Sequence, residues 1–308
     1  MKVAITGATG FIGSRLVERL TDEKHAIVAF SRNPEKARRR FPTTAFPQVE
    51  IVGCDLTQPG AWQQAISGCD GVVNLAGEPL AEGRWTPDVK QKILNSRQLC
   101  TRQVVDAIAQ AESKPSVLVS ASAIGYYGTS ETASFEESSA PGKDFLAEVC
   151  QAWEQEAQRV QESGTRLAIL RIGIVVGPGG AIAKMVLPFK LFAGGPIGSG
   201  QQWFSWIHRE DLVNLILRSL TDASMAGTYN ATAPNPVRMN ELCNTLGSVL
   251  GRPSWLPVPG FALETLLGEG AQVVLNGQQV LPKQTQASGF DYQYPTLKPA
   301  LQQAVKGM

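Results

Sequence analysis

The stretch Thr6-Gly7-Ala8-Thr9-Gly10-Phe11-Ile12-Gly13 guides the interpretation of the whole chain. It follows a short apolar run and opens an amphipathic run at 11–20, a pattern that predicts a strand, a tight turn and a helix. In a turn of this kind Gly7 permits the bend, Gly10 lets a pyrophosphate approach the backbone, and Gly13 lets the helix pack on the strand. Free N–H groups at a helix N-terminus attract phosphate, so the stretch predicts a dinucleotide site.

The runs that follow this stretch predict an α/β fold. Short segments rich in Val, Ile and Leu predict strands at 3–5, 26–30, 49–52, 71–75, 117–120 and 167–176. Amphipathic segments between them predict helices at 11–20, 61–66, 89–109 and 145–161. Near-continuous apolar strands that alternate with helices are typical of a parallel sheet covered on both faces. We therefore expect a Rossmann-type doubly wound parallel sheet.

The composition changes after Gly177, which predicts a second part of the chain. Gly and Pro become denser between 178 and 200, and the aromatic residues at 203, 204 and 206 follow. We expect a dinucleotide-binding domain at 1–177, its sheet completed in part by later segments, and a smaller C-terminal substrate lobe at 178–308. Within that lobe we expect helices at 211–220 and 240–250, a strand at 227–231 and a Pro-punctuated tail at 253–308. The lobe should lie over the carboxyl ends of the strands, where open α/β sheets bind ligands.

The residues after the second, third and fourth predicted strands indicate which dinucleotide binds. Ser31-Arg32 stands where NAD enzymes usually place an acidic residue for the ribose 2′-OH. An arginine beside a hydroxyl suits a 2′-phosphate instead, so the pattern favours NADP over NAD. We expect Asp55-Leu56 to meet the adenine, and Leu75-Ala76-Gly77 to let the backbone approach the adenine-side ribose.

Composition restricts the function classes. With 308 residues, 43% of them hydrophobic, and a formal net charge of +1, the chain is typical of a soluble protein without a basic surface for nucleic acid. Five scattered cysteines fit reduced thiols, and two histidines do not suffice for a histidine-rich metal centre. We predict a cytoplasmic protein with a small-molecule substrate and with no metal site, no nucleic-acid partner and no membrane span.

Further motifs resemble the short-chain dehydrogenase/reductase superfamily in its extended, epimerase-like form. They are VSAS at 119–122, GYYG at 125–128, RIGIVVGP at 171–178 and WIHREDL at 206–212. The strongest resemblance is to an atypical epimerase subfamily with its own C-terminal domain, through SAIGYYG, GSGQQWFSWIH and VLPKQTQASGF. It implies an NADP(H)-dependent oxidoreductase or epimerase. Its cyanobacterial SulA-like and plastid giant-chloroplast members imply an alternative, a non-catalytic NADP(H)-binding regulator with a role in cell division.

The resemblance breaks at the residues that transfer the proton. Typical members use a serine with a tyrosine and a lysine spaced as YxxxK on one helix face. Ser122 matches the serine, but the tyrosine and lysine positions hold Leu146 and Cys150. One interpretation makes Tyr126 or Tyr127 the proton carrier, with Ser122 as the orienter. A second interpretation places the Cys150 thiol beside the nicotinamide; the alternative for this residue is that it is a small buried hydrophobe. A third interpretation is that the protein binds NADP(H) without turning it over.

Substrate and assembly are less constrained. We expect a small polar substrate, for example a nucleotide-linked one, and His208 is either a substrate contact or part of a helix cap. The lysines or arginines that could supply positive charge for catalysis or for a diphosphate are Lys143, Lys184, Lys190, Arg209 and Arg238. Extended members often form dimers through paired helices, so the long helix at 89–109 could supply a homodimer face. The regulatory alternative would need a protein partner.

Overall fold

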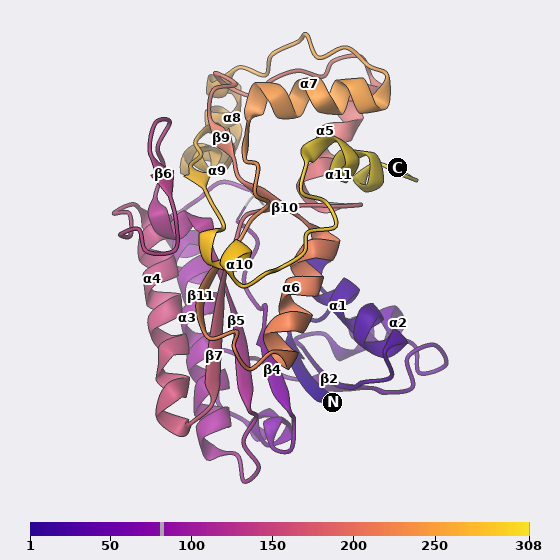
Figure 1. Cartoon of the computed structure of the whole chain (residues 1–308), viewed down its shortest axis with the longest axis vertical. Coiled ribbons are helices and arrows are strands. Elements are labelled where there is room, and N and C mark those ends of the chain that lie inside the picture. The colour runs from indigo at the N-terminus through magenta and orange to yellow at the C-terminus, as the bar shows by residue number, and fades with distance from the viewer. Residues whose placement is uncertain (81–82, 308) are drawn as a thin grey trace.

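A seven-stranded parallel sheet carries the fold in the computed structural model, which describes residues 1–80 and 83–307 (Figure 1). In spatial order its strands are β11 (Gly227–Ala231), β7 (Arg166–Ile172), β5 (Val117–Ala123), β4 (Gly71–Asn74), β1 (Lys2–Thr6), β2 (Ala26–Ser31) and β3 (Val49–Gly53). All neighbouring strands run parallel. The predicted Rossmann-type sheet is therefore confirmed.

Helices cover both faces of this sheet. They are α1 (Phe11–Asp22), α2 (Pro34–Arg40), α3 (Pro87–Gln110), α4 (Phe145–Gln158) and α6 (Arg209–Thr221). Figure 1 shows α3 and α4 on one side and α1 and α6 on the other. The 3₁₀ helices η1 (Ala61–Ile66), η2 (Ile124–Tyr127) and η3 (Arg159–Ser163) complete this part. Both α6 and β11 come from segments after Gly177, so the later chain contributes to the sheet.

The remaining elements form a lobe above the carboxyl ends of the strands (Figure 1). Its helices are α5 (Gly180–Lys190), α7 (Met239–Leu250), α8 (Gly260–Leu267), η4 (Gly268–Ala271), α9 (Gln272–Leu275), α10 (Lys283–Ala287) and α11 (Leu297–Ala304). Its strand pairs are β8 (Ile174–Val176) with β10 (Trp206–His208), β9 (Trp203–Phe204) with β12 (Val237–Arg238), and β6 (Ser134–Phe135) with β13 (Gln279–Val280). The lobe has its own apolar core, to which α5, α7 and α11 contribute.

Three sequence-based element predictions need correction. The apolar run at 167–176 is two strands, because the carbonyl of Ser205 packs on Gly173, where an added Cβ would come within 2.7 Å of its oxygen. The chain therefore leaves the main sheet there, and β8 pairs with β10. The segment at 61–66 is a 3₁₀ helix, and the α-helix predicted at 145–161 ends at Gln158 and continues as a 3₁₀ turn.

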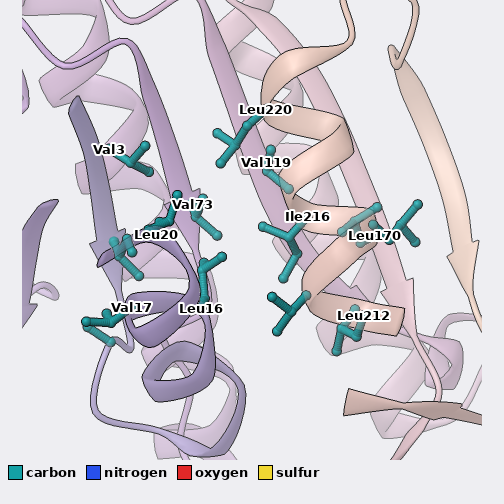
Figure 2. Packing of buried hydrophobic residues seen from close by; sticks show 14 of the residues in the cluster. Val3, Leu16, Val17, Leu20, Val73, Val119, Leu170, Leu212, Ile216 and Leu220 are labelled. Atoms are coloured by element: carbon teal, nitrogen blue, oxygen red, sulfur yellow. The ribbon is translucent and has the colours of Figure 1, made fainter. Parts of the chain in front are cut away.

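The core under α1 and α6 shows why the apolar pattern dictates this layer. Figure 2 shows Leu16, Val17 and Leu20 from α1 and Leu212, Ile216 and Leu220 from α6 against Val3, Val73, Val119 and Leu170 of the strands. These side chains are buried. Fully burying an aliphatic side chain of this size contributes about 1.5–3 kcal/mol, so the cluster fixes both helices on the sheet.

The glycine stretch lies where the strand order reverses, between β1 and β4. Gly7 has a φ of +67°, and a Cβ there would lie 2.8 Å from the carbonyl carbon of Leu75, at the end of β4. A Cβ on Gly13 would lie 2.3 Å from the carbonyl oxygen of Gly7. Only glycine fits both positions, so strand, turn and helix meet backbone to backbone.

The C-terminal tail returns across the edge of the sheet and ties the lobe to it. Gln278 donates from Nε2 to the Ile124 carbonyl over 2.8 Å. The Asp211 carboxylate, at the start of α6, accepts the backbone N–H groups of Gln293 and Tyr294 at 2.7 and 3.0 Å. The tail thus covers the carboxyl ends of the central strands.

A bilayer-spanning helix is absent from the described residues, since no helix among them combines the length and apolar character that a span needs.

We expect Gly13→Ala to destabilise the protein by about 1–3 kcal/mol, because its Cβ must displace backbone atoms in a packed turn. Urea denaturation measures this change. Gly260→Ala is the matched control, since the nearest atom to its Cβ is a leucine methyl at an ordinary 3.5 Å. Equal stability of the two variants would contradict the backbone-contact account of the glycine stretch.

Candidate functional site

A hydrogen-bonded link joins β1 and β4 beneath the glycine stretch. The Thr6 hydroxyl donates to Asn74 Oδ1 at 2.7 Å and accepts the N–H groups of Leu75 and Ala76, both at 3.1 Å. Asn74 in turn donates to Thr101 of α3 at 2.8 Å. Buried polar groups are thus satisfied, and the two strand ends are held at a fixed separation. Sequence reasoning did not single out Thr6 and Thr101, whose roles depend on the strand order.

The N-terminus of α1 is open toward the edge of the sheet. Gly10 is the N-cap residue, and its N–H group turns back to the Gly7 carbonyl at 3.0 Å. The first N–H groups of any α-helix have no partner within the helix, which makes this end suitable for an anion. Thr9 and Ile12 are half-buried and Gly10 is exposed. The predicted cofactor-binding residues at 7–13 therefore lie together on one turn.

Phe11 extends from this turn toward the lobe. A Cβ on Gly179 or Gly180 would lie 3.1 Å from the Phe11 ring. The Arg209 guanidinium lies 5.0 Å from the centre of the same ring, and Nε of Arg209 is buried without a partner among the described residues. The loop after β8 therefore packs against the side chain of Phe11 at the start of α1.

The residues after β2 and β3 lie beside one another. Arg32 keeps 74% of its side chain exposed and makes a 3.5 Å contact with Glu78 Oε2. Ser31 is largely buried, and its hydroxyl bonds to the backbone of Asn33 at 3.1 Å. Hydrogen bonds from Thr57 lower the pKa of Asp55, and the nearby Arg32 acts in the same direction.

Leu56 and the segment after β4 differ in their surroundings. The Leu56 side chain is buried in the core on the α3 face, so its part in contacting adenine stays a prediction. Leu75 and Ala76 pack against Gly7. Gly77 lies against the Arg97 guanidinium, whose Cζ would be 3.1 Å from an added Cβ. Sequence reasoning missed Arg97, because nothing in the pattern of its helix distinguishes it from other arginines.

A cavity of about 230 Å³ opens at the carboxyl ends of β5 and β7. Ala123 and Gly173 border it where these strands end, and residues 272–278 of the tail form its far wall. Leu146 and Cys150 line it from α4. A side chain on Gly125 would meet both, at 3.4 Å from Leu146 Cβ and 3.8 Å from Cys150 Sγ. The two positions where related enzymes carry tyrosine and lysine therefore do face a cavity.

The Cys150 thiol is a neutral group in this wall. It is 4% exposed, its Sγ lies 3.7 Å from the Ala123 carbonyl oxygen, and burial raises its pKa to about 12. A thiol, not a thiolate, is then present at neutral pH, and the thiol is a poor nucleophile. This agrees with Cys150 as a small buried hydrophobe.

The hydroxyl of Ser122 donates a hydrogen bond to a buried ion pair. Glu154 and Arg171 are each 5% exposed and are joined by two 2.8 Å hydrogen bonds. Ser122 donates to Glu154 Oε1 at 2.6 Å. Burial by itself would lower the pKa of Arg171, but the hydrogen bonds and charge of Glu154 outweigh it and raise that pKa.

The tyrosines of η2 belong to the same network. Arg171 donates to the Tyr127 hydroxyl at 3.0 Å, and Tyr127 donates to Asn230 at 2.7 Å. The Arg171 guanidinium lies 3.4 Å from the centre of the Tyr126 ring. In the described part of the chain neither Ser122 nor Tyr126 borders the cavity. Their catalytic roles stay predictions, and the network gives Ser122 a structural partner.

His208 and the aromatic run have separate roles. The His208 ring accepts the N–H of Glu210 at 3.2 Å as the N-cap of α6, lies 2.9 Å from Gln303, and is fully buried. Helix capping, not substrate contact, accounts for it. Phe204 and Trp206 are in the lobe core, whereas Trp203 borders the cavity. No cluster of His, Cys, Asp and Glu suited to a metal occurs at 1–80 or 83–307.

Comparison with known proteins places this fold and site in a family. Residues 3–231 match the NAD dependent epimerase/dehydratase family, and residues 258–304 match a domain of unknown function, DUF1731. The chain belongs to the NAD-dependent epimerase/dehydratase family. The resemblance inferred from the glycine stretch and the later motifs is therefore confirmed, including the C-terminal extension.

Relatives match over nearly the whole length. The chloroplastic homologue of epimerase family protein SDR39U1 from Arabidopsis thaliana is 54% identical over 98% of this chain and 86% of its own. Epimerase family protein YfhF of Bacillus subtilis is 40% identical over 99% of this chain and 98% of its own. The human SDR39U1 crystal structure with NADPH covers 100% of both chains at 33% identity, with a TM-score of 0.87.

We expect Glu154→Gln to cost about 3–5 kcal/mol of stability, because it leaves Arg171 buried without its counter-charge. Ser122→Ala should cost less, about 1.5–3 kcal/mol, for the loss of one charge-assisted hydrogen bond. Urea denaturation measures both, with Glu23→Gln in the exposed Arg19–Glu23 pair as the control. If Glu154→Gln were as stable as the control, the ion pair would not have the structural role assigned to it.

Proposed function

We propose that this chain is an NADP(H)-dependent oxidoreductase or epimerase that acts on a small molecule in the cavity at the ends of β5 and β7. The observation that carries the proposal is the glycine turn, where Gly7 and Gly13 leave no room for a side chain beneath an open helix N-terminus. Such a turn at the reversal of strand order is where dinucleotides bind in open α/β sheets.

The cofactor would lie across the carboxyl edge of the sheet. Its pyrophosphate would meet residues 7–13, its adenosine half would extend toward β2 and β3, and its nicotinamide half would cross β4 toward the cavity. Ser31 and Arg32 would bind the 2′-phosphate, with Asp55 and Leu56 near the adenine. Residues 75–77 would border the adenine-side ribose. The human relative solved with NADPH supports this choice of dinucleotide.

Arg32 favours NADP because its side chain is exposed and its ion-pair contact, to Glu78, is a long one of 3.5 Å. A weak surface pair contributes little stability, so the guanidinium is free to exchange it for a phosphate. Arginine matches a phosphate in a two-point geometry that a ribose hydroxyl does not offer.

We expect Arg32→Asp to weaken NADPH binding at least tenfold and to narrow or reverse the preference over NADH, since it removes a charge-assisted contact. Quenching of protein fluorescence by each dinucleotide gives the two dissociation constants. Lys114→Asp makes the same charge change at an exposed residue before β5, away from the carboxyl edge. An unchanged NADPH/NADH ratio in Arg32→Asp would refute the assignment.

The chemistry within the cavity would differ from that of relatives with a tyrosine–lysine pair. A bound nicotinamide supplies or accepts hydride. The chain would exclude water with its largely apolar walls, and Leu146 and Cys150 add no charge to them. We retain Tyr126 as the proposed proton carrier, with Ser122 as its orienter. Tyr126 lies in η2, whose residues Ile124 and Gly125 border the cavity.

Turnover is tested by the loss of NADPH absorbance with a panel of ketones, enones and sugar nucleotides. We expect hydride transfer to at least one class, and Tyr126→Phe to lower kcat about 10²–10⁴-fold, the usual contribution of general acid–base catalysis. Tyr229→Phe is the control, because that hydroxyl bonds to the Ala226 carbonyl outside the cavity. Tight NADPH binding without any turnover would favour the non-catalytic regulator instead.

Compartment, assembly and domain boundaries are also proposals. We infer a cytoplasmic protein, although the Arabidopsis relative is named chloroplastic. We keep the homodimer through the helix at 89–109 and the protein partner as hypotheses. The proposed function divides the chain into two parts. The dinucleotide-binding domain is 1–177 together with α6 and β11, and the substrate lobe is the rest of 178–308. Nothing in the fold or the site points to cell division.

A further inference from the structure

One cationic side chain borders the cavity in the described part of the chain, and it is Arg97 of α3. Its guanidinium lies between the backbone of Gly77 and the indole of Trp153, whose ring centre is 5.4 Å from Cζ. Burial lowers the pKa of Arg97, although an arginine remains charged at any physiological pH. The wall of the cavity therefore carries a positive charge that is largely desolvated.

The guanidinium is incompletely paired. Nη1 donates to the Ile93 carbonyl at 3.2 Å and Nη2 donates to the Glu78 carbonyl at 3.0 Å. Both acceptors are neutral, and among residues 1–80 and 83–307 no carboxylate lies within ion-pair distance of Arg97, on which the Glu78 charge acts only from further away. Because a guanidinium carries five N–H donors, donors remain for a further partner. A desolvated charge without a counter-charge is costly, which favours an anion beside it.

A second donor without a partner lies next to Arg97. The indole Nε1 of Trp153 is buried and has no hydrogen-bond acceptor among the described residues. Buried polar groups are normally paired, and an exception indicates strain or an absent partner. Trp153 does not line the cavity, so its indole N–H supports the inference only as a sign that acceptors are scarce around Arg97.

The rest of the cavity limits the size and polarity of that ligand. The walls include the apolar side chains of Leu80, Leu146, Val149 and Val273. The Asp144 carboxylate also borders the cavity, where it caps α4 by accepting the Ala147 N–H at 2.9 Å. The volume of the cavity, about 230 Å³, is below the ~300–1,000 Å³ typical of pockets for drug-sized ligands. A sugar nucleotide would need more space and more than one cation for its diphosphate. The shape and charge instead suit a small molecule with an apolar body and one anionic end.

We propose that the cavity binds a small apolar carboxylic acid, whose carboxylate pairs with Arg97 and whose body packs on the leucine and valine wall. This inference rests on the proposed function, because it names the class of substrate that would lie beside the nicotinamide. It also replaces the small polar substrate expected from the sequence with a mainly apolar one. Arg97 is then a specificity-determining residue.

The test compares acids with neutral molecules of nearly equal shape. Calorimetric titrations use 4-methylpentanoate and benzoate against 4-methylpentanamide and benzamide, with the protein alone and with NADPH-saturated protein. We expect the acids to bind at least tenfold more tightly than the amides. Arg97→Met should reduce acid affinity about ten- to hundredfold and leave amide affinity unchanged, since a charge-assisted pair is lost. Arg97→Lys keeps the charge without the planar guanidinium, so its acid affinity should lie between those of the unaltered protein and Arg97→Met.

Controls separate this inference from folding and from cofactor binding. Arg102→Met alters the same helix at an arginine that pairs with Glu156 outside the cavity, and it should leave acid affinity unchanged. Thermal melting verifies that each variant folds. Equal affinity of acids and amides would overturn the inference. So would an Arg97→Met variant that loses NADPH affinity but keeps acid affinity, because Arg97 would then serve the cofactor. Failure of NADPH to bind the unaltered protein would overturn the proposed function only, since the acid titration without cofactor still decides this inference.

Discussion

The close approach of backbone to backbone at Gly7 and Gly13 is the constraint on which the rest of the molecule depends. With a carbonyl oxygen 2.3 Å from where a Cβ of Gly13 would stand, α1 can lie directly on the end of β1 only if both positions lack side chains. That contact sets the direction of the open helix N-terminus, and the Thr6–Asn74 link holds β4 beside it. The proposed cofactor path and the cavity beyond it both follow from this geometry.

The second organising interaction is the buried pair of Glu154 and Arg171. It joins α4 to β7, and through Tyr127 and Asn230 it reaches β11 and the returning tail. A buried pair of this kind contributes little net stability but is costly to break, so it fixes one arrangement of the segments around the cavity. Ser122 donates to Glu154 and so belongs to this network. A serine that matches a catalytic motif therefore has a structural partner here.

The cavity is assembled from segments that are distant in the sequence. Arg97 comes from α3, Cys150 from α4, and residues 272–278 from the tail. Periodicity predicted the helices that carry Arg97 and Cys150, and the family resemblance predicted that Leu146 and Cys150 would occupy the tyrosine and lysine positions. No local pattern indicated that Arg97 lies against Gly77, or that its charge has no ionic partner among the described residues, because both depend on how α3 packs beside β4.

The sequence by itself determined the parallel α/β sheet and the glycine turn, and it supplied the prediction that Arg32 binds a phosphate. These features follow from short-range chemistry: apolar runs, glycine spacing and one charged side chain at a strand end. The tertiary structure alone decided the break of the apolar run at Gly173, the capping role of His208, the partner of Ser122 and the place of Arg97. The break at Gly173, the partner of Ser122 and the place of Arg97 depend on contacts between residues far apart in the chain, such as Ser205 on Gly173 and Glu154 on Ser122. The His208 cap is a local contact with Glu210, but the burial of the ring beside Gln303 is what distinguished the cap from a substrate contact. Sequence spacing carries no information about such long-range contacts.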